Sequence, residues 1–456
     1  MRKIYMLFII CLFLTDYAIA QNNQWQNLFN GKDLSGWKVL GGTATFDVEN
    51  GVIVGTTVAG SPNTFLVTEK EYGDFILEAE VMVEAAEGNS GIQTRSHFDP
   101  VASNGKGKVY GRQCEVDPSH RRWTGGIYDE GRREWLYPVD LNHTAKNAYK
   151  KGVYNHFKIE CIGNEMKTWV NGVPVAYLID TLDPKGFIGL QVHSVNSPDL
   201  VGKKVFFKNI RIKTKGLKPM PFPDYVYVVN VVPNQIDDFE KKSGWKLLFD
   251  GKSSAGWRSA KGKTFPDKGW EIKNGTLLVL GNDGSESTNG GDIVTNEKFS
   301  AFDLSFEFNF TPGANSGVKY FVTLAEETKG SNIGLEYQIM DDTLHEDAKL
   351  GRNGNRTLAS LYDLIKAEKQ KRFIKQAGQW NRGRIIVYPN DKVEHYLNGV
   401  KVLEYIRGSK EYRDLVAISK YVKWNNFGEA AEGHILLQEH GFAVSFRSIK
   451  IKKLNW

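Results

Sequence analysis

The chain has 456 residues, of which 41% are hydrophobic and 25% charged, with 46 glycines, 11 tryptophans and 3 cysteines. This composition excludes a disordered chain, a collagen, a coiled coil and a small disulfide-framework protein. The 59 basic and 53 acidic side chains give a formal net charge of +6, a mixture too even to indicate a nucleic-acid partner. At roughly 150 residues per domain, the length favours two or three domains.

The first 20 residues have the pattern of a secretory signal peptide. Arg2 and Lys3 precede an apolar run over residues 4–14, and Ala18-Ile19-Ala20 supplies the small residues of a cleavage site. The run is too short to span a bilayer, which takes about 20 residues, and no later segment is apolar enough to do so. We therefore expect cleavage near Ala20, a periplasmic or secreted protein, and no membrane span.

Alternation of apolar and polar residues predicts strands along much of the remaining chain. Phe75–Val83 and Phe302–Phe310 show this period most clearly, and Lys167–Val170 leads into an Asn-Gly turn. Short strands with Gly-rich turns favour an all-β fold, an antiparallel β-sandwich of the jelly-roll or concanavalin A-like type. The exception is Ala359–Lys371, whose leucines and isoleucine keep a helical spacing and predict a helix.

A short turn, Asn89-Ser90-Gly91, opens a predicted strand that carries Gln93 and Arg95. Small residues allow a ligand to approach the backbone closely. A bound carbonyl or hydroxyl could use Arg95 here or Lys319 in the second half of the chain, although the two give different geometries. The alternative is a simple turn, which Asn-Ser-Gly commonly forms.

The first polar cluster that could carry chemistry lies on a predicted strand at residues 113–117. Gln113, Glu115 and Asp117 alternate with apolar residues, so they share one face of the strand at a spacing of about 6.5–7 Å. Such side chains are expensive to bury in a core, whereas along an open groove they can contact a ligand. The alternative is an ordinary solvent-facing side of a strand.

Aromatic and histidine side chains follow in the same half. Trp123 and Tyr128 lie in a predicted loop and could stack on a pyranose ring, although core packing is the default for a single aromatic side chain. Gln191 and His193 end a Leu-Gln-x-His segment. His193 is either a structural hydrogen-bonding group or an acid–base group.

Two cysteines, Cys114 and Cys161, remain after removal of the leader. They could form a disulfide in an oxidising compartment, or each could be a small buried apolar side chain. Spacing alone leaves both alternatives open.

The sequence repeats itself once. Leu28–Trp37 recurs as Leu248–Trp257 with six identities in ten. Other repeats keep the same order: residues 89–91 with 315–317, Tyr154-Asn155 with Trp380-Asn381, Asn171-Gly172 with Asn398-Gly399, Leu190–His193 with Leu437–His440, and Phe207–Lys213 with Phe446–Lys452. A period of roughly 220 residues is too long for a solenoid and indicates a tandem duplication. We predict domains at 24–214 and 244–454, joined by a proline-containing linker at 215–243 with one extended strand near Tyr225–Val232.

The second half repeats the polar face with altered residues. Its strand reads Glu336-Tyr337-Gln338, so a carboxylate and an amide exchange places relative to Gln113 and Glu115. The substrate-binding candidates are Gln93, Gln113, Trp123, Tyr128 and Gln191 in the first half, and Lys319, Gln338, Tyr362 and His440 in the second.

Several familiar catalytic patterns are absent from the sequence: the P-loop, the dinucleotide fingerprint, HExxH, paired CxxC and Gly-x-Ser-x-Gly. Glu115-Val116-Asp117 resembles the start of the E-x-D-x-x-E signature of laminarinase-type glycosidases. His120 stands in place of its second glutamate, so the retaining two-carboxylate mechanism lacks a partner.

Taken together, these segments resemble the 3-keto-disaccharide hydrolase family. The resemblance rests on the paired LFxGKxxxGW segments, the Asn-Ser-Gly turns, Gly334–Asp342, Arg356–Leu364 and Phe446–Lys452, and it covers both copies. It implies a concanavalin A-like fold and an exported enzyme that acts on a small-molecule glycoside. The second copy resembles the widespread pattern of the family and the first a variant branch.

The resemblance also implies a reaction. A carbonyl at C3 of a sugar acidifies the hydrogen at C2, so a base can remove it, the aglycone leaves C1, and water adds. The implied catalytic residues are Glu115 or Asp117 as base, Arg95 as carbonyl polariser and His193 as acid in the first copy, or Glu336, Lys319 and His440 in the second. A divalent cation held by Glu115, Asp117 and His193 could replace the polariser, but no spacing requires a metal or another cofactor. The alternatives are a carbohydrate-binding protein, or one catalytic copy beside one binding copy.

Overall fold

A computed structural model describes residues 25–105, 107–324 and 333–455. The predicted signal peptide at residues 1–20 lies outside these ranges and stays a prediction. The chain divides into two compact units, one ending at Val231 and the other beginning at Val232. No helix in the described ranges has the length and apolar character needed to cross a membrane.

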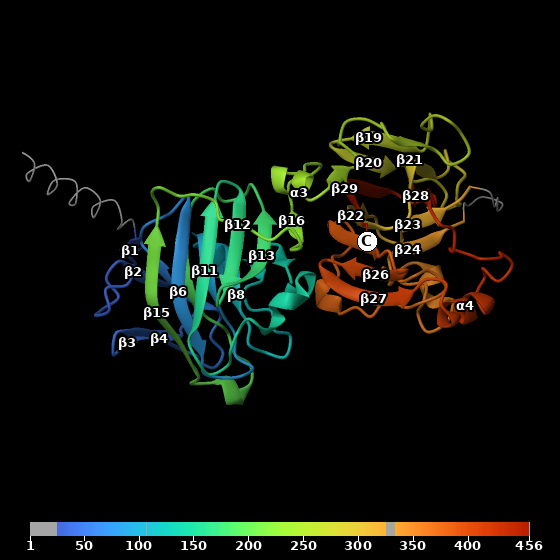
Figure 1. Ribbon diagram of the computed structural model, residues 1–456. Coiled ribbons are helices and arrows are strands. Elements are labelled where there is room, and N and C mark those ends of the chain that lie inside the picture. Colours follow the sequence, from blue (N-terminus) through green and yellow to red (C-terminus); the bar gives the residue numbers. More distant parts are fainter. Residues whose placement is uncertain (1–24, 106, 325–332, 456) are drawn as a thin grey trace, which may run out of the picture. The chain divides into compact units, whose positions relative to one another are not determined.

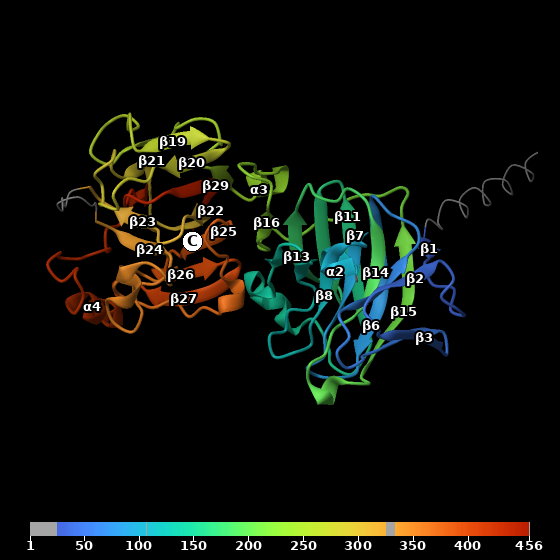
Figure 2. The ribbon, with the colours of Figure 1, turned by 180° about the vertical axis from the view of Figure 1, so that it is seen from behind.

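The first unit is a sandwich of two β-sheets, shown from opposite sides in Figure 1 and Figure 2. One sheet has the order β16 (Val228–Asn230), β13 (Val173–Ile179), β12 (Glu165–Val170), β11 (Asn155–Ile162), β6 (Phe75–Val83), β15 (Lys204–Lys213), β4 (Val52–Thr56) and β3 (Thr45–Glu49), with β1 (Trp25–Asn27) also paired to β15. The other has the order β10 (Glu134–Tyr137), β9 (Ile127–Glu130), β8 (Lys108–Val116), β7 (Ser90–Asp99), β14 (Phe187–Val192), β5 (Thr64–Thr68) and β2 (Trp37–Gly41). Its helical turns are α2 (Ala102–Gly105), η1 (Val139–Leu141), η2 (His143–Asn147) and η3 (Pro198–Leu200).

The second unit repeats this architecture. One sheet has the order β19 (Trp270–Lys273), β20 (Thr276–Val279), β29 (Val444–Lys453), β22 (Phe302–Phe310), β25 (Asn381–Val387), β26 (Lys392–Leu397) and β27 (Val400–Ile406), with β17 (Trp245–Leu247) paired to β29. The other has the order β18 (Trp257–Ser259), β21 (Ile293–Phe299), β28 (Gly433–Leu437), β23 (Asn315–Val322) and β24 (Leu335–Met340). Helical segments are α3 (Asp238–Lys242), α4 (Lys410–Ala417), η4 (Glu346–Lys349) and η5 (Lys371–Phe373).

The alternation that predicts strands also decides which side chains enter the core. Phe302, Phe306 and Phe310 of β22 are at most 4% exposed and belong to the cluster between the sheets. Tyr337 reaches this cluster from β24, and its ring meets that of Phe306 edge-on at 5.3 Å. Since both units are sandwiches of almost entirely antiparallel strands, the fold class expected from the sequence is confirmed.

The tryptophan that ends the repeated LFxGKxxxGW segment makes the same hydrogen bond in both units. The indole N–H of Trp37 donates to the carbonyl of Leu28 at 2.9 Å, and that of Trp257 donates to Leu248 at 2.6 Å. Each tryptophan is buried, and each bond joins residues nine positions apart in the sequence. The tandem duplication therefore repeats structure as well as sequence.

The repeated asparagines form a second matching joint. Asn171 and Asn398 have φ values of 49° and 50°, and the glycine after each completes a tight hairpin turn. Each side-chain amide donates to the buried asparagine that begins the neighbouring strand, Asn155 at 2.7 Å and Asn381 at 2.8 Å. The repeated Asn-Gly segments thus stabilise a hairpin turn against the neighbouring strand and are not part of a catalytic site.

The helix expected at Ala359–Lys371 does not form. Ala359 and Asp363 have φ values of 64° and 61°, which an α-helix excludes. Leu361 instead exchanges backbone hydrogen bonds with Ile365 at 2.9 Å, closing a tight loop. Leu361 and Leu364 are buried as the helical spacing suggested, but turns bring them to the core.

The segment expected to be a linker is partly built into the units. β16 confirms the strand expected near Tyr225–Val232, and it runs parallel to β13. Farther along, α3 begins with a capping box in which Asp237 accepts from the backbone N–H of Glu240 at 2.7 Å. Glu240 is buried and pairs with Lys450 of β29.

Cys114 and Cys161 are both buried, and both carry free thiols. Burial raises the pKa of each thiol. They therefore have the character of small apolar core side chains.

Candidate active site

In the second unit, one face of the β23–β24 pair is polar. Residues directly opposite in an antiparallel pair point to the same side, and Lys319 lies opposite Glu336 while Gly317 lies opposite Gln338. The intervening Tyr337 points into the core. The strand period therefore separates a row of polar side chains from the hydrophobic interior.

Gly317 leaves the space in which the Glu336 side chain lies. A Cβ atom at position 317 would stand 2.4 Å from Oε1 of Glu336. The neighbouring Ser316 donates its hydroxyl to the carbonyl of Gln438 at 2.9 Å and ties β23 to the end of β28. Asn315 adds its amide to the polar face, so each residue of the Asn-Ser-Gly repeat has a separate task.

A cavity of about 390 Å³ opens over this polar face. Its floor consists of residues from β23, β24 and the segment after β28: Asn315, Lys319, Glu336, Gln338, Gln438 and His440. Its walls come from loops and add Glu286, Ile333, Gly334, Tyr362, Lys420, Tyr421, Lys423 and Trp424. The cavity is thus lined mainly by charged, amide and aromatic side chains.

The charged centre of the cavity is Lys319, which lies near two carboxylates. Its Nζ is 3.9 Å from Oε2 of Glu336 and 4.0 Å from Oε1 of Glu286. Burial alone would lower the pKa of Lys319, but the charges of Glu336, Asp292 and Glu286 outweigh burial and raise it. Lys319 therefore keeps its positive charge at neutral pH.

Glu336 is 5% exposed, and burial raises the pKa of its carboxyl group. The positive charges of Lys319 and Lys420 oppose part of this shift. A carboxyl group with a raised pKa holds a proton more readily than an exposed glutamate, which suits a group that both takes and returns a proton.

The amide and imidazole groups of the floor are bonded to one another. Gln338 donates to Oδ1 of Asn315 at 2.9 Å, and the Asn315 amide lies 3.4 Å from Nε2 of His440. Gln438 donates to Oε1 of Glu286 at 2.8 Å. These bonds fix the orientation of the side chains before any ligand binds.

Three buried polar atoms of the floor have no hydrogen-bond partner among the described residues: Oε1 of Gln338, Oε1 of Gln438 and Nδ1 of His440. Buried polar atoms in folded proteins almost always have a partner, and such a group left alone costs about 1–3 kcal/mol. The two amide oxygens can accept hydrogen bonds, and Nδ1 of His440 can donate or accept one. A ligand rich in hydroxyl groups would supply the missing partners.

Lys420 and Tyr362 form one wall of the cavity. The Lys420 amine lies 4.2 Å from the centre of the Tyr362 ring, and the Tyr362 hydroxyl donates to Oδ2 of Asp347 at 2.7 Å. Asp363 fixes this wall, since it accepts from the backbone N–H of Lys420 at 2.8 Å and from Nε of Arg356 at 2.8 Å. Burial lowers the pKa of the Lys420 amine.

The sequence patterns did not indicate Glu286, Lys420, Tyr421 or Trp424 as site residues. None of them belongs to a repeated motif, so comparing the copies could not reveal them. One signal was available: the displacement between copies grows from 227 at Asn171/Asn398 to 247 at Leu190/Leu437. The extra segment contains α4 and the cavity wall after it, so the insertion itself marks the site.

The first unit has the same frame with different residues on it. Gln93 lies opposite Gln113, and Gly91 lies opposite Glu115. By register, Gln113 therefore corresponds to Glu336, and Glu115 corresponds to Gln338. Gly91 again leaves room for its neighbour, since a Cβ there would stand 2.1 Å from Cδ of Gln113.

The polar side chains of the first unit bond to one another in a chain. Ser96 donates to Gln93 at 2.6 Å, Gln93 donates to Gln113 at 2.8 Å, and Gln113 donates to Oε2 of Glu115 at 2.9 Å. Asn89 donates to the other oxygen of Glu115 at 2.7 Å. Glu115 is 4% exposed and the two glutamines at most 1%. Both oxygens of Glu115 are thus already occupied by amides.

Asp117 and His193 lie near Glu115 but have partners of their own. Burial raises the pKa of Glu115 to about 7, although its hydrogen bonds to Asn89 and Gln113 oppose the rise. Asp117 pairs with Arg121 at 2.9 Å. Nδ1 of His193 lies 2.6 Å from the carbonyl of Ser194, and burial lowers the pKa of the imidazole. Gln191 keeps its Oε1 3.3 Å from the amide of Gln113.

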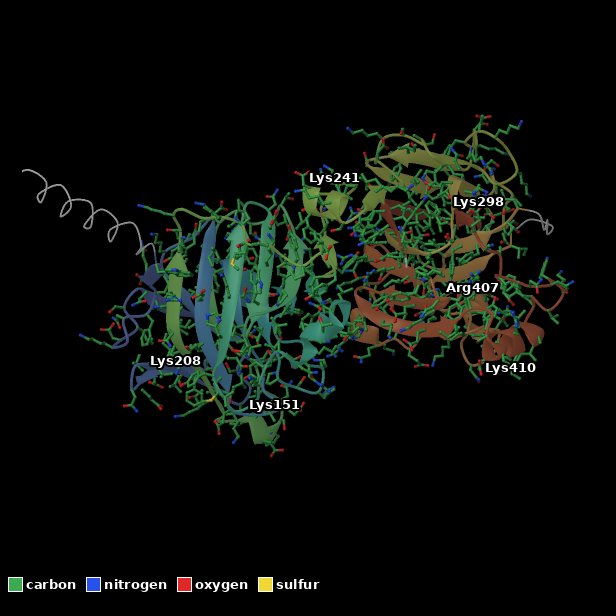
Figure 3. All side chains as sticks on the ribbon, in the orientation of Figure 1. Lys151, Lys208, Lys241, Lys298, Arg407 and Lys410 are labelled. Carbon is green, nitrogen blue, oxygen red and sulfur yellow. The ribbon has the colours of Figure 1, made fainter. Side chains whose placement is uncertain are left out.

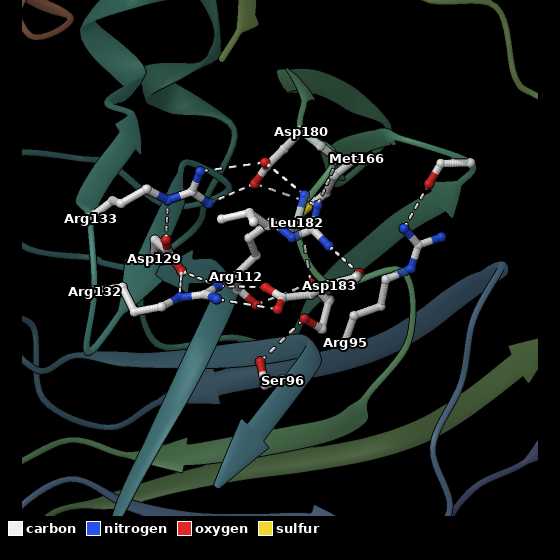
Figure 4. Close-up of polar contacts among 12 residues, drawn as sticks. Arg95, Ser96, Arg112, Asp129, Arg132, Arg133, Met166, Asp180, Leu182 and Asp183 are labelled. Carbon is white, nitrogen blue, oxygen red and sulfur yellow. Dashed lines mark hydrogen bonds and ion pairs between the residues drawn. The ribbon is translucent and has the colours of Figure 1, made fainter. Parts of the chain in front are cut away.

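The structure does not bring Arg95 to this polar face. Its three guanidinium nitrogens donate to the carbonyls of Gly73 and Gly163 and to the carboxylate of Asp74, at 2.7–2.9 Å. Arg95 is 1% exposed and has a φ of 47°, at an irregularity in β7 that turns it from the row of Gln93. Figure 4 shows it beside the Arg112 network. This placement does not fit the role of carbonyl polariser.

The aromatic candidates of the first unit pack against one another. Trp123 is 3% exposed and its indole N–H donates to Asp140 at 3.2 Å. Trp135 meets the rings of Trp123 and Tyr128 edge-on at 4.6 and 5.3 Å. Trp123 is therefore a packed side chain, while the half-buried Tyr128 and Trp135 retain partial exposure.

Within the described ranges, no group of three or more His, Cys, Asp or Glu side chains is arranged to hold a metal ion. This includes Glu115, Asp117 and His193, which the sequence suggested as an alternative metal site.

Comparison with known proteins agrees with the repeated sequence. The sequence profile of the 3-keto-alpha-glucoside-1,2-lyase-like domain matches residues 24–213 and again residues 244–452. The chain belongs to this family. A 3-keto-disaccharide hydrolase of Bacteroides thetaiotaomicron is 37% identical over 233 residues, which are 46% of this chain and 79% of that protein.

Two solved structures were also compared with this member of the lyase-like family. One, from Parabacteroides distasonis and provisionally called a glycosyl hydrolase, shares 29% identity, covers 49% of this chain and 100% of its own, and has a TM-score of 0.43. The other, the carbohydrate-binding module CBM66 from Bacillus subtilis, shares 17% identity, covers 39% of this chain and 94% of its own, and has a TM-score of 0.26.

Proposed function

We propose that the second unit cleaves the glycosidic bond of 3-keto-glycosides, by elimination next to the C3 carbonyl followed by addition of water. Family membership and the 37% identical 3-keto-disaccharide hydrolase support a glycoside-acting enzyme in general. The observation that carries the assignment to the second unit is the cavity in which a buried lysine lies between two carboxylates.

The charges of the cavity match the charges of the reaction. Removal of the C2 proton places negative charge on the C3 oxygen, and a fixed positive charge stabilises such an enediolate. Lys319 supplies that charge, and its neighbours keep it protonated. In the first unit the corresponding residue is the neutral Gln93, which supplies no charge.

Glu336 is the proposed base. It lies opposite Lys319 on the neighbouring strand, so a sugar carbonyl bound by Lys319 has its C2 within reach of the Glu336 carboxylate. His440 is the proposed acid for the leaving oxygen, and Gln338, Gln438 and Asn315 are proposed to bind the hydroxyl groups. The unpartnered atoms of Gln338, Gln438 and His440 support this assignment.

The test is aglycone release from a 3-keto-glucoside, beside the same glucoside without the ketone. We expect release only from the ketone, and slower release when the C2 hydrogen is replaced by deuterium, because the C2–H bond breaks. Equal release from both glucosides would contradict the proposal, since an ordinary hydrolase needs no carbonyl. Addition of EDTA to the same assay tests a metal requirement.

For the first unit we propose sugar binding without cleavage. Its carboxylate is enclosed by amides, yet Oδ1 of Asn89 and Nε2 of Gln191 have no partner among the described residues. Tyr128 lies opposite Gln113 and packs against Trp135, and both aromatic side chains are partly exposed. Trp135→Ala should weaken binding of a glycoside about tenfold while turnover at saturating substrate is unchanged. Loss of turnover at saturation would contradict this role.

We further propose that the chain is exported with cleavage near Ala20, as the first 20 residues predict. N-terminal sequencing of the protein from its host tests this, and a retained Met1 would contradict it.

A further inference from the structure

The second unit places two lysines in one cavity, and their surroundings differ. Lys319 lies 4 Å or less from two carboxylates and is 5% exposed. Lys420 is an exposed residue that lines the cavity, and its amine makes no hydrogen bond or ion pair within the described ranges. The amine lies over the rings of Tyr362 at 4.2 Å and Tyr421 at 5.3 Å.

These surroundings shift the pKa values of the two amines in opposite directions. Lys319 is held charged by Glu336 and Glu286. The pKa of Lys420 is lowered, chiefly because the amine is partly removed from water. The negative charge of Glu336 opposes this shift, and the positive charge of Lys319 adds to it. An amine that is partly removed from water and feels the charge of a second cation is a usual arrangement of a lysine nucleophile that attacks carbonyl groups.

The backbone holds Lys420 at the cavity. Asp363 accepts from its N–H at 2.8 Å, and the preceding Ser419 is buried and donates its hydroxyl to the carbonyl of Val416 at 2.9 Å. The following Tyr421 is fixed by stacking on Phe427 at 3.9 Å. The amine is thus carried on a rigid turn, as a nucleophile requires.

We infer that Lys420 forms a Schiff base with the C3 carbonyl of the sugar bound in this cavity. This inference rests on the proposed function, because it requires a ketone substrate. The uncharged amine adds to C3. The carbinolamine hydroxyl then takes a proton from the Glu336 carboxyl group and leaves as water, which gives a protonated imine and a Glu336 carboxylate. The imine withdraws electrons from C2 more strongly than the ketone does, which makes the C2 proton easier to remove.

The remaining steps balance without an oxidant or a cofactor. Glu336 takes the C2 proton, and the electrons of the C2–H bond form an enamine between C2 and C3. The nitrogen lone pair then re-forms the C=N bond at C3, the C2–C3 electrons form a double bond between C1 and C2, and the bond from C1 to the aglycone oxygen breaks. That oxygen takes its proton from His440. One water then hydrolyses the protonated imine, which restores the amine, returns a proton to His440 and releases the unsaturated 3-keto sugar, to which water adds. In this route the enamine nitrogen takes the place of the enediolate oxygen, and Lys319 stabilises the C3 oxygen until that oxygen leaves as water.

The experiment is reductive trapping of the full-length protein. Sodium cyanoborohydride is added during turnover of a 3-keto-glucoside, and the protein is examined by intact mass and peptide mapping. We expect inactivation that requires the ketone substrate, with one sugar attached to Lys420. Lys420→Arg should lose the adduct and at least about a thousandfold of turnover, since arginine cannot form the imine. Lys410→Arg is the matched control, because Lys410 on α4 is 82% exposed and pairs with Asp414 at 2.6 Å (Figure 3).

Each outcome decides between the two proposals. Turnover of the ketone without inactivation or labelling by cyanoborohydride overturns the Schiff base and leaves the proposed function standing. Labelling of Lys319 in place of Lys420 also overturns it. No turnover of the ketone by the wild-type protein overturns both. Should Lys420→Arg fail to fold by circular dichroism, the trapping of the wild-type protein still decides the question.

Discussion

The two units build the same frame and place different chemistry on it. At three register-matched positions the first unit has Gln93, Gln113 and Glu115, where the second has a lysine, a glutamate and a glutamine. In the first unit these side chains saturate one another through hydrogen bonds. In the second they surround a cavity and leave polar atoms unpartnered. A glutamate–glutamine exchange, one added positive charge and the loops that form the cavity walls therefore distinguish the open site from the closed network.

A second difference lies behind the polar face. Arg112 of β8 is 1% exposed and corresponds by register to Leu335, a core residue of the second unit. Its charge is balanced by Asp180 at 3.7 Å within a network of arginines and aspartates drawn in Figure 4. A buried cation is stable only when it is paired with anions and hydrogen-bonded. Removing one of its partners lowers the stability of the fold, because an uncompensated buried charge remains. At this position the first unit therefore has a buried network of ion pairs, whereas the second unit has hydrophobic packing.

The largest expected effect comes from removing the buried cation of the second unit. Lys319→Met should lower turnover of a 3-keto-glucoside by about a thousandfold, because the oxygen at C3 loses its stabilising charge. Lys319→Arg should recover part of this loss. The matched change Gln93→Met in the first unit should alter turnover less than about threefold. Aglycone release at saturating substrate measures all three, and equal losses in both units would remove the distinction between them.

The paired glycines give the next effect. In Gly317→Ala the new methyl group displaces the Glu336 carboxylate, and a displacement of about 1 Å costs roughly a hundredfold in turnover. Gly91→Ala displaces Gln113 from the same relative position, and turnover should stay near the wild-type value. Because the closest contacts are with side-chain atoms and not with the backbone, both variants should fold, which circular dichroism checks. Full turnover in Gly317→Ala would mean that the position of Glu336 is unimportant.

The closed network of the first unit should be visible in the pH dependence of stability. Burial raises the pKa of Glu115 to about 7 from an ordinary value of 4.5. Between these values the folded state holds a proton that the unfolded state has lost, so the unfolding free energy falls as pH rises through this window and levels off above it. The loss is on the order of 3 kcal/mol. Glu115→Gln should remove this slope in urea titrations at several pH values, and parallel curves for both proteins would contradict the shift.

The smallest effect should be the same in both units. Asn171→Ala and Asn398→Ala each remove side-chain hydrogen bonds and place alanine at a φ near 50°. Each should lower the free energy of unfolding by about 2 kcal/mol. Urea midpoints measure this loss, and turnover per folded molecule should not change. A turnover loss confined to Asn398→Ala would show that this joint serves the site and not only the fold.

The sequence predicted the sandwich fold and the duplication because both depend on local patterns. The alternation of apolar and polar residues determines which side of β22 faces the core. The repeated Trp and Asn-Gly segments make hydrogen bonds to residues nearby in the sequence. The prediction of a helix at Ala359–Lys371 was wrong, because hydrophobic spacing alone does not reveal the positive φ angles of Ala359 and Asp363. Tertiary contacts of Asp363 with Arg356 and Lys420 hold that loop.

The candidate site was only partly predictable. Lys319, Glu336, Gln338 and His440 share matching strand positions with the first copy, and the structure brings all four to one cavity. Arg95 could not be judged from sequence, since an irregularity in β7 turns it from the row it would otherwise join. Glu286 and Lys420 approach from loops, whose paths the strand period does not describe.

The most direct test of the account compares Glu336→Gln with Glu115→Gln in one assay of aglycone release from a 3-keto-glucoside. We predict a loss of at least about a hundredfold for Glu336→Gln, because the base is gone, and a change within about threefold for Glu115→Gln. A large loss in Glu115→Gln with normal turnover in Glu336→Gln would place the chemistry in the first unit and contradict the account.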